Sequence, residues 1–357
     1  MDKKTTLLNC TFVKTILMLT VILGHSTAFW ANDWFTAREP VFAADWLGIL
    51  SNWLGSFHIY AFVLVSGYIF AYKMSGGGYT SYGEFLENKA RRLIIPYVFV
   101  AGVWVVPLSQ YFYKWDVEGI IQKYVLCINP SQLWFLWMLF WVFAMVWPLW
   151  KWLSGSMIKG SMIALVLYGV GLVGGHFIPN IYCIWTAFQY IPFFFIGIQI
   201  RVQSEKLENK LKNIDSRHSN RLLIEKIPVV LWVMLDLLIF YIDWLAGQGK
   251  FPIPGMAVMT GFILHIIGAV MAFVVLQKTA SKFAWKENKC FSKLVKCSMP
   301  MYLLHQQIIY FLIVVFNGRV NPYINATLNF ILSTVISFLI STILIRFKYT
   351  RLLVGEK

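Results

Sequence analysis

Residues 10–30 read CTFVKTILMLTVILGHSTAFW and contain one charged side chain, Lys14. A bilayer core about 30 Å thick is crossed by a helix of roughly 20 mostly apolar residues. The stretch therefore predicts a membrane-spanning helix. No small-residue cleavage site follows it, so we expect a retained anchor and not a signal peptide.

The composition of the whole chain agrees with this interpretation. Of the 357 residues, 59% are apolar and 13% are charged, whereas average proteins carry about 25% charged residues. Such a chain lacks the polar side chains that would cover a water-facing surface, which excludes an ordinary soluble domain. The net charge of +15 would suggest nucleic-acid binding in a soluble protein. Here it predicts a membrane topology, and we expect no nucleic-acid partner.

Ten apolar segments follow one another along the chain. No loop between them is long enough for a second domain, and no internal repeat of 20–50 residues is visible. The sequence predicts an all-α, polytopic membrane protein that forms a single domain over residues 1–357. The predicted spans lie near residues 10–30, 47–72, 93–112, 133–150, 161–178, 182–200, 227–245, 256–276, 298–317 and 324–345.

Positive charge is distributed unequally between the two sets of loops. With both termini placed in the cytoplasm, the inner segments hold 26 Lys and Arg and the outer segments hold five. Cytoplasmic loops carry the excess of Lys and Arg in membrane proteins, which supports this orientation. Trp30, Trp34, Trp46 and Trp53 gather near the outer ends of spans, where we expect them to anchor the helices at the interface.

The first span carries two polar side chains on one stripe. Lys14 and His25 are eleven residues apart, which places them within about 20° of each other around a helix and about 16 Å apart along it. A cation at the cytoplasmic rim and an imidazole in the outer half would suit a long ligand with an anionic head. An imidazole, with an ordinary pKa near 6.5, exchanges a proton at neutral pH. A snorkelling lysine and a hydrogen-bonded core histidine are the alternative, and both interpretations stay open here.

Other polar residues fall at membrane depth. His58 lies in the outer third of the second span, close in depth to His25, so that the two histidines are expected to flank one site. The small pair Ser66 and Gly67 predicts close helix packing. Lys89 and Arg92 start the third span at the cytoplasmic rim and are candidates for clamping phosphate, with ordinary topological anchoring as the alternative.

Later spans contribute three further polar positions. Asp236 and His265 lie midway along the seventh and eighth spans, which predicts a buried structural pair. His305, with Tyr302 one turn before it, is expected about two turns inside the cytoplasmic boundary. The five cysteines show neither a CxxC motif nor zinc spacing, so neither a disulfide framework nor a metal site is predicted.

Taken together, these segments resemble the acyltransferase-3 family of integral membrane O-acyltransferases. That family carries a basic residue, ten intervening positions and a histidine in its first helix, and Lys14 and His25 match this spacing. Four further segments match in order: FHIYAFVLVSGY (57–68), KARRLIIPY (89–97), LWFLWML (133–139) and SMPMYLLHQ (298–306). Three positions depart from the usual pattern, with Thr11 for Asp, Tyr60 for Pro and Lys14 for the commoner Arg.

The resemblance implies a membrane O-acyltransferase, most simply an acetyltransferase, of the cell membrane. It implies that acetyl-CoA in the cytoplasm is the donor and that a hydroxyl of a cell-surface glycan or lipid-linked glycan precursor is the acceptor. No bound cofactor is needed. The implied roles are His25 as the catalytic base, or as a transient acyl carrier, and donor binding by Lys14, Lys89 and Arg92. Further candidates for touching the substrate or supporting the site are His58, Ser66, Tyr302 and His305.

Two readings from other classes compete with this one. Ten helices with buried Asp and His also suit a transporter or flippase for a lipid-linked or small polar substrate. A catalytically silent scaffold is the third reading. The chain ends soon after the tenth span, so we expect no appended hydrolase-like domain. The sequence names neither the acceptor, the acyl chain, the side of acceptor modification nor the oligomeric state.

Overall fold

The computed structural model describes residues 3–31, 34–78, 81–212, 228–250, 255–282, 285 and 288–356. These residues are almost entirely helical and contain no strand. Ten of the described segments are long and apolar enough to cross a membrane, which confirms the predicted fold class. They span residues 9–30, 45–75, 82–113, 131–155, 157–177, 181–207, 229–247, 256–282, 289–316 and 322–344.

The main helices follow the predicted spans closely, and two of the spans are interrupted. The second span is divided into α2 and α3 at Ser56, and the third continues from α4 through a π-helical turn into α5. The helices are α1 (Lys3–Thr27), α2 (Asp45–Gly55), α3 (His58–Ser75), α4 (Tyr82–Val100), α5 (Val106–Tyr113), α6 (Val117–Ile120), α7 (Trp134–Gly155), α8 (Met157–Phe177), α9 (Ile184–Lys212), α11 (Val229–Gly247), α12 (Met256–Lys282), α13 (Lys289–Phe316), α14 (Pro322–Leu344) and α15 (Lys348–Leu353).

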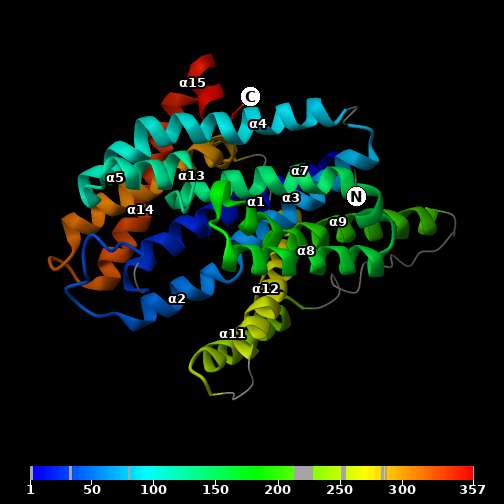
Figure 1. The fold of residues 1–357 in the computed structure, drawn as a ribbon, viewed down its shortest axis with the longest axis horizontal. Coiled ribbons are helices and arrows are strands. Elements are labelled where there is room, and N and C mark those ends of the chain that lie inside the picture. The colour runs from blue at the N-terminus through cyan, green and yellow to red at the C-terminus, as the bar shows by residue number, and fades with distance from the viewer. Residues whose placement is uncertain are drawn as a thin grey trace.

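Helix α1 lies in the centre of the bundle. It contacts α2, α3, α12, α13 and α14, so its polar side chains face protein and not lipid. The hairpin of α11 and α12 projects away from the rest of the bundle (Figure 1). We call the end of the bundle near His25 the outer end and the end near Lys14 the inner end, following the predicted orientation.

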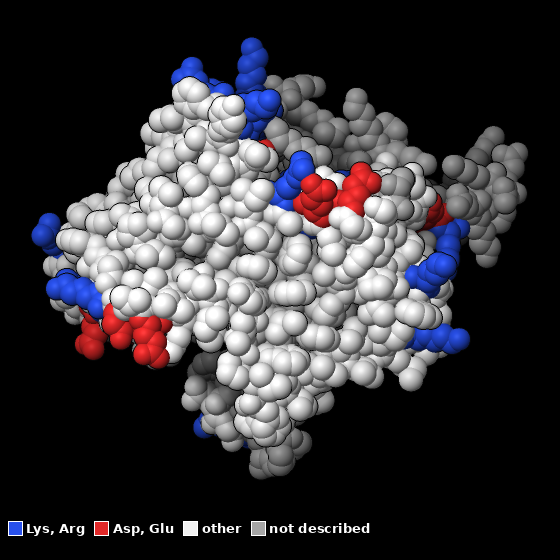
Figure 2. Space-filling view, turned by 45° about the horizontal axis from the view of Figure 1, so that its top comes forward, with Lys and Arg blue, Asp and Glu red and all other residues white. Residues whose placement is uncertain are grey.

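Charged side chains are sparse on the surface. Figure 2 shows a broad uncharged area, with the Lys, Arg, Asp and Glu side chains gathered mostly toward its margins. This is the distribution expected of a surface that faces lipid in its middle and water at its ends. The predicted basic stretch from 201 to 227 lies largely outside the described residues.

Glycine permits the tightest helix contact in the bundle. A Cβ atom built on Gly67 of α3 would lie 2.0 Å from the carbonyl oxygen of Phe194, and one built on Gly197 of α9 would lie 1.9 Å from that of Leu64. No side chain fits at such distances, so α3 and α9 pack backbone against backbone. This confirms the prediction that the Ser66–Gly67 pair serves close packing.

Candidate active site

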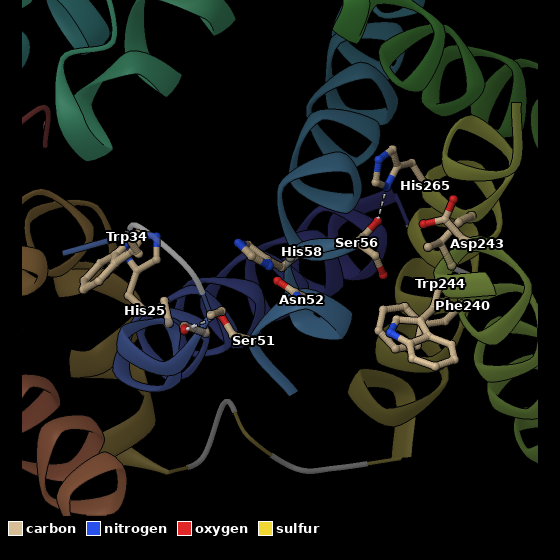
Figure 3. Close-up of a pocket in the computed structure, with 15 residues that line it drawn as sticks. His25, Trp34, Ser51, Asn52, Ser56, His58, Phe240, Asp243, Trp244 and His265 are labelled. Atoms are coloured by element: carbon tan, nitrogen blue, oxygen red, sulfur yellow. Dashed lines mark hydrogen bonds between the residues drawn. The ribbon is translucent and has the colours of Figure 1, made fainter. Parts of the chain in front are cut away.

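A cavity of about 610 Å³ opens among α1, α2, α3, α11 and α12 at the outer end of the bundle. Figure 3 shows His25 and Trp34 on one side of it and Asp243 and Trp244 on the other. It combines aromatic rings, imidazoles and small polar groups. The lining residues are Gly24, His25, Ala28, Ala31, Trp34, Ser51, Asn52, Gly55, Ser56, His58, Phe240, Asp243, Trp244, Leu264 and His265.

The His25 side chain is paired with a histidine from a distant part of the chain. Its Nδ1 lies 2.8 Å from Nε2 of His305, and the two rings stack at 5.0 Å with an interplanar angle of 17°. Nδ1 of His305 in turn lies 2.7 Å from the carbonyl oxygen of Tyr302. The three groups form a continuous hydrogen-bonded chain from the backbone of α13 to the cavity.

This chain fixes the tautomer of both rings. A carbonyl oxygen only accepts, so Nδ1–H of His305 donates to Tyr302 and its Nε2 is left as an acceptor. Nδ1–H of His25 therefore donates to His305, and Nε2 of His25 keeps its lone pair. A neutral imidazole held in this way can take a proton from a hydroxyl group.

His305 is itself held by the segment before α7. The Tyr302 hydroxyl donates to the carbonyl oxygen of Gln132. The Gln132 amide donates back to α13, 3.0 Å from the carbonyl oxygen of Leu303 and 2.7 Å from Oε1 of Gln307. All of these side chains are buried. The network makes His305 a rigid partner for His25.

The predicted depth of His305 was wrong. Helix α13 begins at Lys289 instead of near residue 298, because its first turns continue the span into the inner basic segment. His305 is therefore about 24 Å from the start of the helix, at the level of His25. It lies buried behind His25, beside the outer cavity and not in an inner vestibule.

His58 flanks the same cavity, as predicted from its depth. Its Nδ1–H donates to the carbonyl oxygen of Leu54, one turn earlier, which leaves Nε2 as an acceptor. His265 is arranged in the same way, with Nδ1 2.8 Å from the carbonyl oxygen of Ser56. The cavity therefore presents imidazoles from α1, α3 and α12, each with one nitrogen fixed by a hydrogen bond.

The predicted pair of Asp236 and His265 is wrong. Asp236 is fully buried and accepts a hydrogen bond of 2.8 Å from Nε1 of Trp53, while His265 binds the α2–α3 junction. The carboxylate beside His265 is Asp243, which accepts from the Thr260 hydroxyl at 2.7 Å. Along α12, Asp243 lies beside Thr260 and Asp236 lies beside Gly268, so that His265 falls between the levels of the two carboxylates.

Two tryptophans that were predicted as interfacial anchors have other surroundings. The ring of Trp34 lies 5.1 Å from that of His25 and lines the cavity. Trp53 binds Asp236, as described above. Trp46 is 72% exposed, as an anchor would be. Aromatic rings beside polar groups are the surfaces on which flat apolar faces of a ligand stack.

Positive charge gathers around Lys14, in the middle of α1. Lys14 is partly buried and lies within range of the charges of Arg92 on α4 and Lys73 on α3. Glu356, which follows α15, lies near Arg92 and Arg351; burial raises its pKa, and the two arginines lower it in part. The Lys89 ammonium lies 3.6 Å from the centre of the Phe143 ring on α7. Lys89 therefore faces α7, which is a different helix from those near Lys14.

The remaining predicted residue, Ser66, is buried within α3, where its hydroxyl donates to the carbonyl oxygen of Phe62 at 2.9 Å. It does not line the outer cavity. Among the described residues, no group of His, Cys, Asp and Glu is arranged to hold a metal ion. The roles predicted for the site residues stay predictions, and the structure supplies their positions.

The sequence missed several residues that the structure brings to the site. Trp34, Asn52 and Asp243 line the cavity, and Gln132 supports it. Span ends of membrane proteins are rich in such residues for topological reasons, so their types alone carried no distinguishing signal. Gln132 could have been found from the sequence, because it directly precedes LWFLWML (133–139), one of the segments that resemble the acyltransferase-3 family.

Ten apolar helices long enough to cross a membrane define a multi-pass membrane protein, and its outer cavity is lined by the hydrogen-bonded imidazole of His25. The family model of the acyltransferase-3 domain, described as an acyltransferase domain, matches residues 9–346. The chain therefore belongs to the acyltransferase-3 family and is a membrane acyltransferase. No curated protein and no solved structure matches the chain.

Proposed function

We propose that this protein is a membrane O-acetyltransferase of the cell membrane. It transfers an acetyl group from cytoplasmic acetyl-CoA to a hydroxyl of a cell-surface glycan or of its lipid-linked precursor. The observation that carries the proposal is the fixed tautomer of His25, which lines the outer cavity and keeps the lone pair of its Nε2, while Lys14 lies eleven residues earlier on the same helix.

The donor would be held from the inner end. Lys14, Lys89 and Arg92 supply the positive charge for its phosphates, and the pantetheine arm would extend along α1. Because Lys14 and His25 are about 16 Å apart along the helix axis, only a long donor brings its thioester to the imidazole. This supports a nucleotide-linked thioester over a short acyl phosphate.

The reaction would take place at Nε2 of His25. This nitrogen accepts the proton of the acceptor hydroxyl while the oxygen attacks the thioester carbonyl, and the carbon–sulfur bond breaks as the new ester forms. The proton then passes to the departing CoA thiolate. The hydrogen bond to His305 stabilises the imidazolium that exists in between, because a charged donor strengthens the bond. General base catalysis of this kind typically contributes about 10²- to 10⁴-fold.

The cavity suits a polyhydroxylated acceptor. His58 and Asn52 offer hydrogen-bonding groups between the two sides of the cavity, and Trp34 and Trp244 offer ring faces on either side. Sugars present both hydroxyl groups and apolar faces, so this lining supports a glycan acceptor.

The test uses purified protein in lipid nanodiscs with acetyl-CoA labelled in the acetyl group and a glycolipid extract. Release of CoA and transfer of label are measured for wild type, His25→Ala and a control, His176→Ala, whose side chain is exposed on α8. We expect transfer by wild type and control and its loss in His25→Ala with an unchanged melting temperature. If the wild-type protein consumes no acetyl-CoA yet binds the glycolipid, the proposal is wrong. Transport of an intact substrate is then the hypothesis to test.

A further inference from the structure

Helix α9 brings an arginine to the inner end of the bundle that the donor site described so far does not include. The close contact of α3 and α9 at Gly67 and Gly197 brings the last turns of α3 beside the part of α9 that follows Gly197. As a result, the guanidinium of Arg201 lies 5.1 Å above the ring of Tyr72. The neighbouring residue on α3 is Lys73.

Arg201 is buried and incompletely paired. Its exposed fraction is 6%, and its Nε has no hydrogen-bond partner. The Glu205 carboxylate is 3.6 Å from one terminal nitrogen, which is beyond good hydrogen-bonding distance, and its side chain is 34% exposed. A guanidinium has five N–H donors, and a buried charge is costly unless these are satisfied. The surroundings thus leave donors for an additional anion.

Arg201 belongs to the same charged region as Lys14. The charges of both residues act on the thiol of Cys10, which lies one turn before Lys14 on α1. Arg92 and Lys73 act on Lys14 in turn. Cations from α1, α3, α4 and α9 therefore surround the inner end of the stripe that leads to His25. Among the described residues, the carboxylates near these cations are those of Glu205 and Glu356, so the described cations outnumber them.

We propose that Arg201 binds a phosphate group of the acyl donor. This inference rests on the proposed function. A guanidinium is suited to the task because its planar fork binds two phosphate oxygens at once, and stacking on Tyr72 fixes its plane. The occupant is a thioester donor that carries several phosphates, since a single carboxylate would not balance the excess charge.

Binding of CoA to the full-length protein in phosphatidylcholine nanodiscs tests this assignment by titration calorimetry. The variants are Arg201→Gln, the conservative Arg201→Lys, and Lys159→Gln as a control, because Lys159 is an exposed cation at the inner end of α8. We expect Arg201→Gln to weaken CoA binding about tenfold or more, Arg201→Lys to weaken it less, and the control to bind like wild type.

A second measurement separates phosphate binding from a structural role. The preference for acetyl-CoA over S-acetylpantetheine, which has no nucleotide phosphates, should fall about tenfold in Arg201→Gln. Equal loss with both donors means that Arg201 only supports the fold, and overturns the inference. An unchanged CoA affinity in Arg201→Gln also overturns the inference. If phosphatidylglycerol in addition stabilises the wild type but not this variant, the occupant is a lipid phosphate. If wild type does not bind CoA at all, it is the proposed function that fails.

Discussion

Replacement of His305 tests the hydrogen-bonded chain behind the proposed base. His305→Leu removes the acceptor of the 2.8 Å bond and leaves Nδ1–H of His25 without a partner in a partly buried place. The ring of His25 then loses both its fixed orientation and its preferred tautomer. His305→Gln keeps an acceptor oxygen near the former Nε2 position and should restore part of the activity.

The magnitude follows from the hydrogen bond that is lost. An unsatisfied buried donor costs about 1–3 kcal/mol. If the transition state bears the whole cost, the turnover number falls about 5- to 150-fold, since 1.36 kcal/mol corresponds to a factor of ten. The affinity for CoA should not change, because His305 lies at the outer cavity, far from the inner cations.

The assay is the nanodisc acetyl-transfer reaction with kcat, KM for acetyl-CoA and melting temperature measured for each variant. We expect a lower kcat, an unchanged KM and partial recovery in His305→Gln. A wild-type kcat in His305→Leu would refute the reasoning about the tautomer. A selective rise in KM would instead assign His305 to donor binding.

Three further outcomes are expected. Gly197→Ala should destabilise the bundle by about 3 kcal/mol or more, because its Cβ would lie 1.9 Å from a carbonyl oxygen of α3. Gly169→Ala is the control and should not destabilise the bundle, because Gly169 has open space around it. Equal melting temperatures of the two variants would contradict this. Trp53→Phe should cost about 1.5–3 kcal/mol in thermal unfolding, since it removes the donor to the buried Asp236 carboxylate, and the exposed Trp46→Phe is the control that should melt like wild type. Glu356→Gln should tighten CoA binding up to about fivefold in calorimetry, because it removes a negative charge near the inner cations; weaker binding would show that the carboxylate supports the site.

Much of the architecture was predictable because membrane insertion is governed by local composition. A run of about 20 apolar residues defines a span wherever it occurs, and all ten predicted spans are present in the described residues. Helical periodicity is equally local. It placed Lys14 and His25 on one stripe of α1 and brought His58 to the depth of His25, and both of those histidines line the outer cavity.

Which helices become neighbours was not predictable in the same way, because it depends on packing between residues far apart in the chain. The apolar runs all satisfy the bilayer equally, so nothing in them selects a partner helix. Only the tertiary structure pairs His25 with His305, 280 residues away, and directs Asp236 to Trp53 instead of His265. The sequence by itself determined the spans and the stripe that joins Lys14 to His25, and the packing of the helices around α1 decided which side chains meet that stripe.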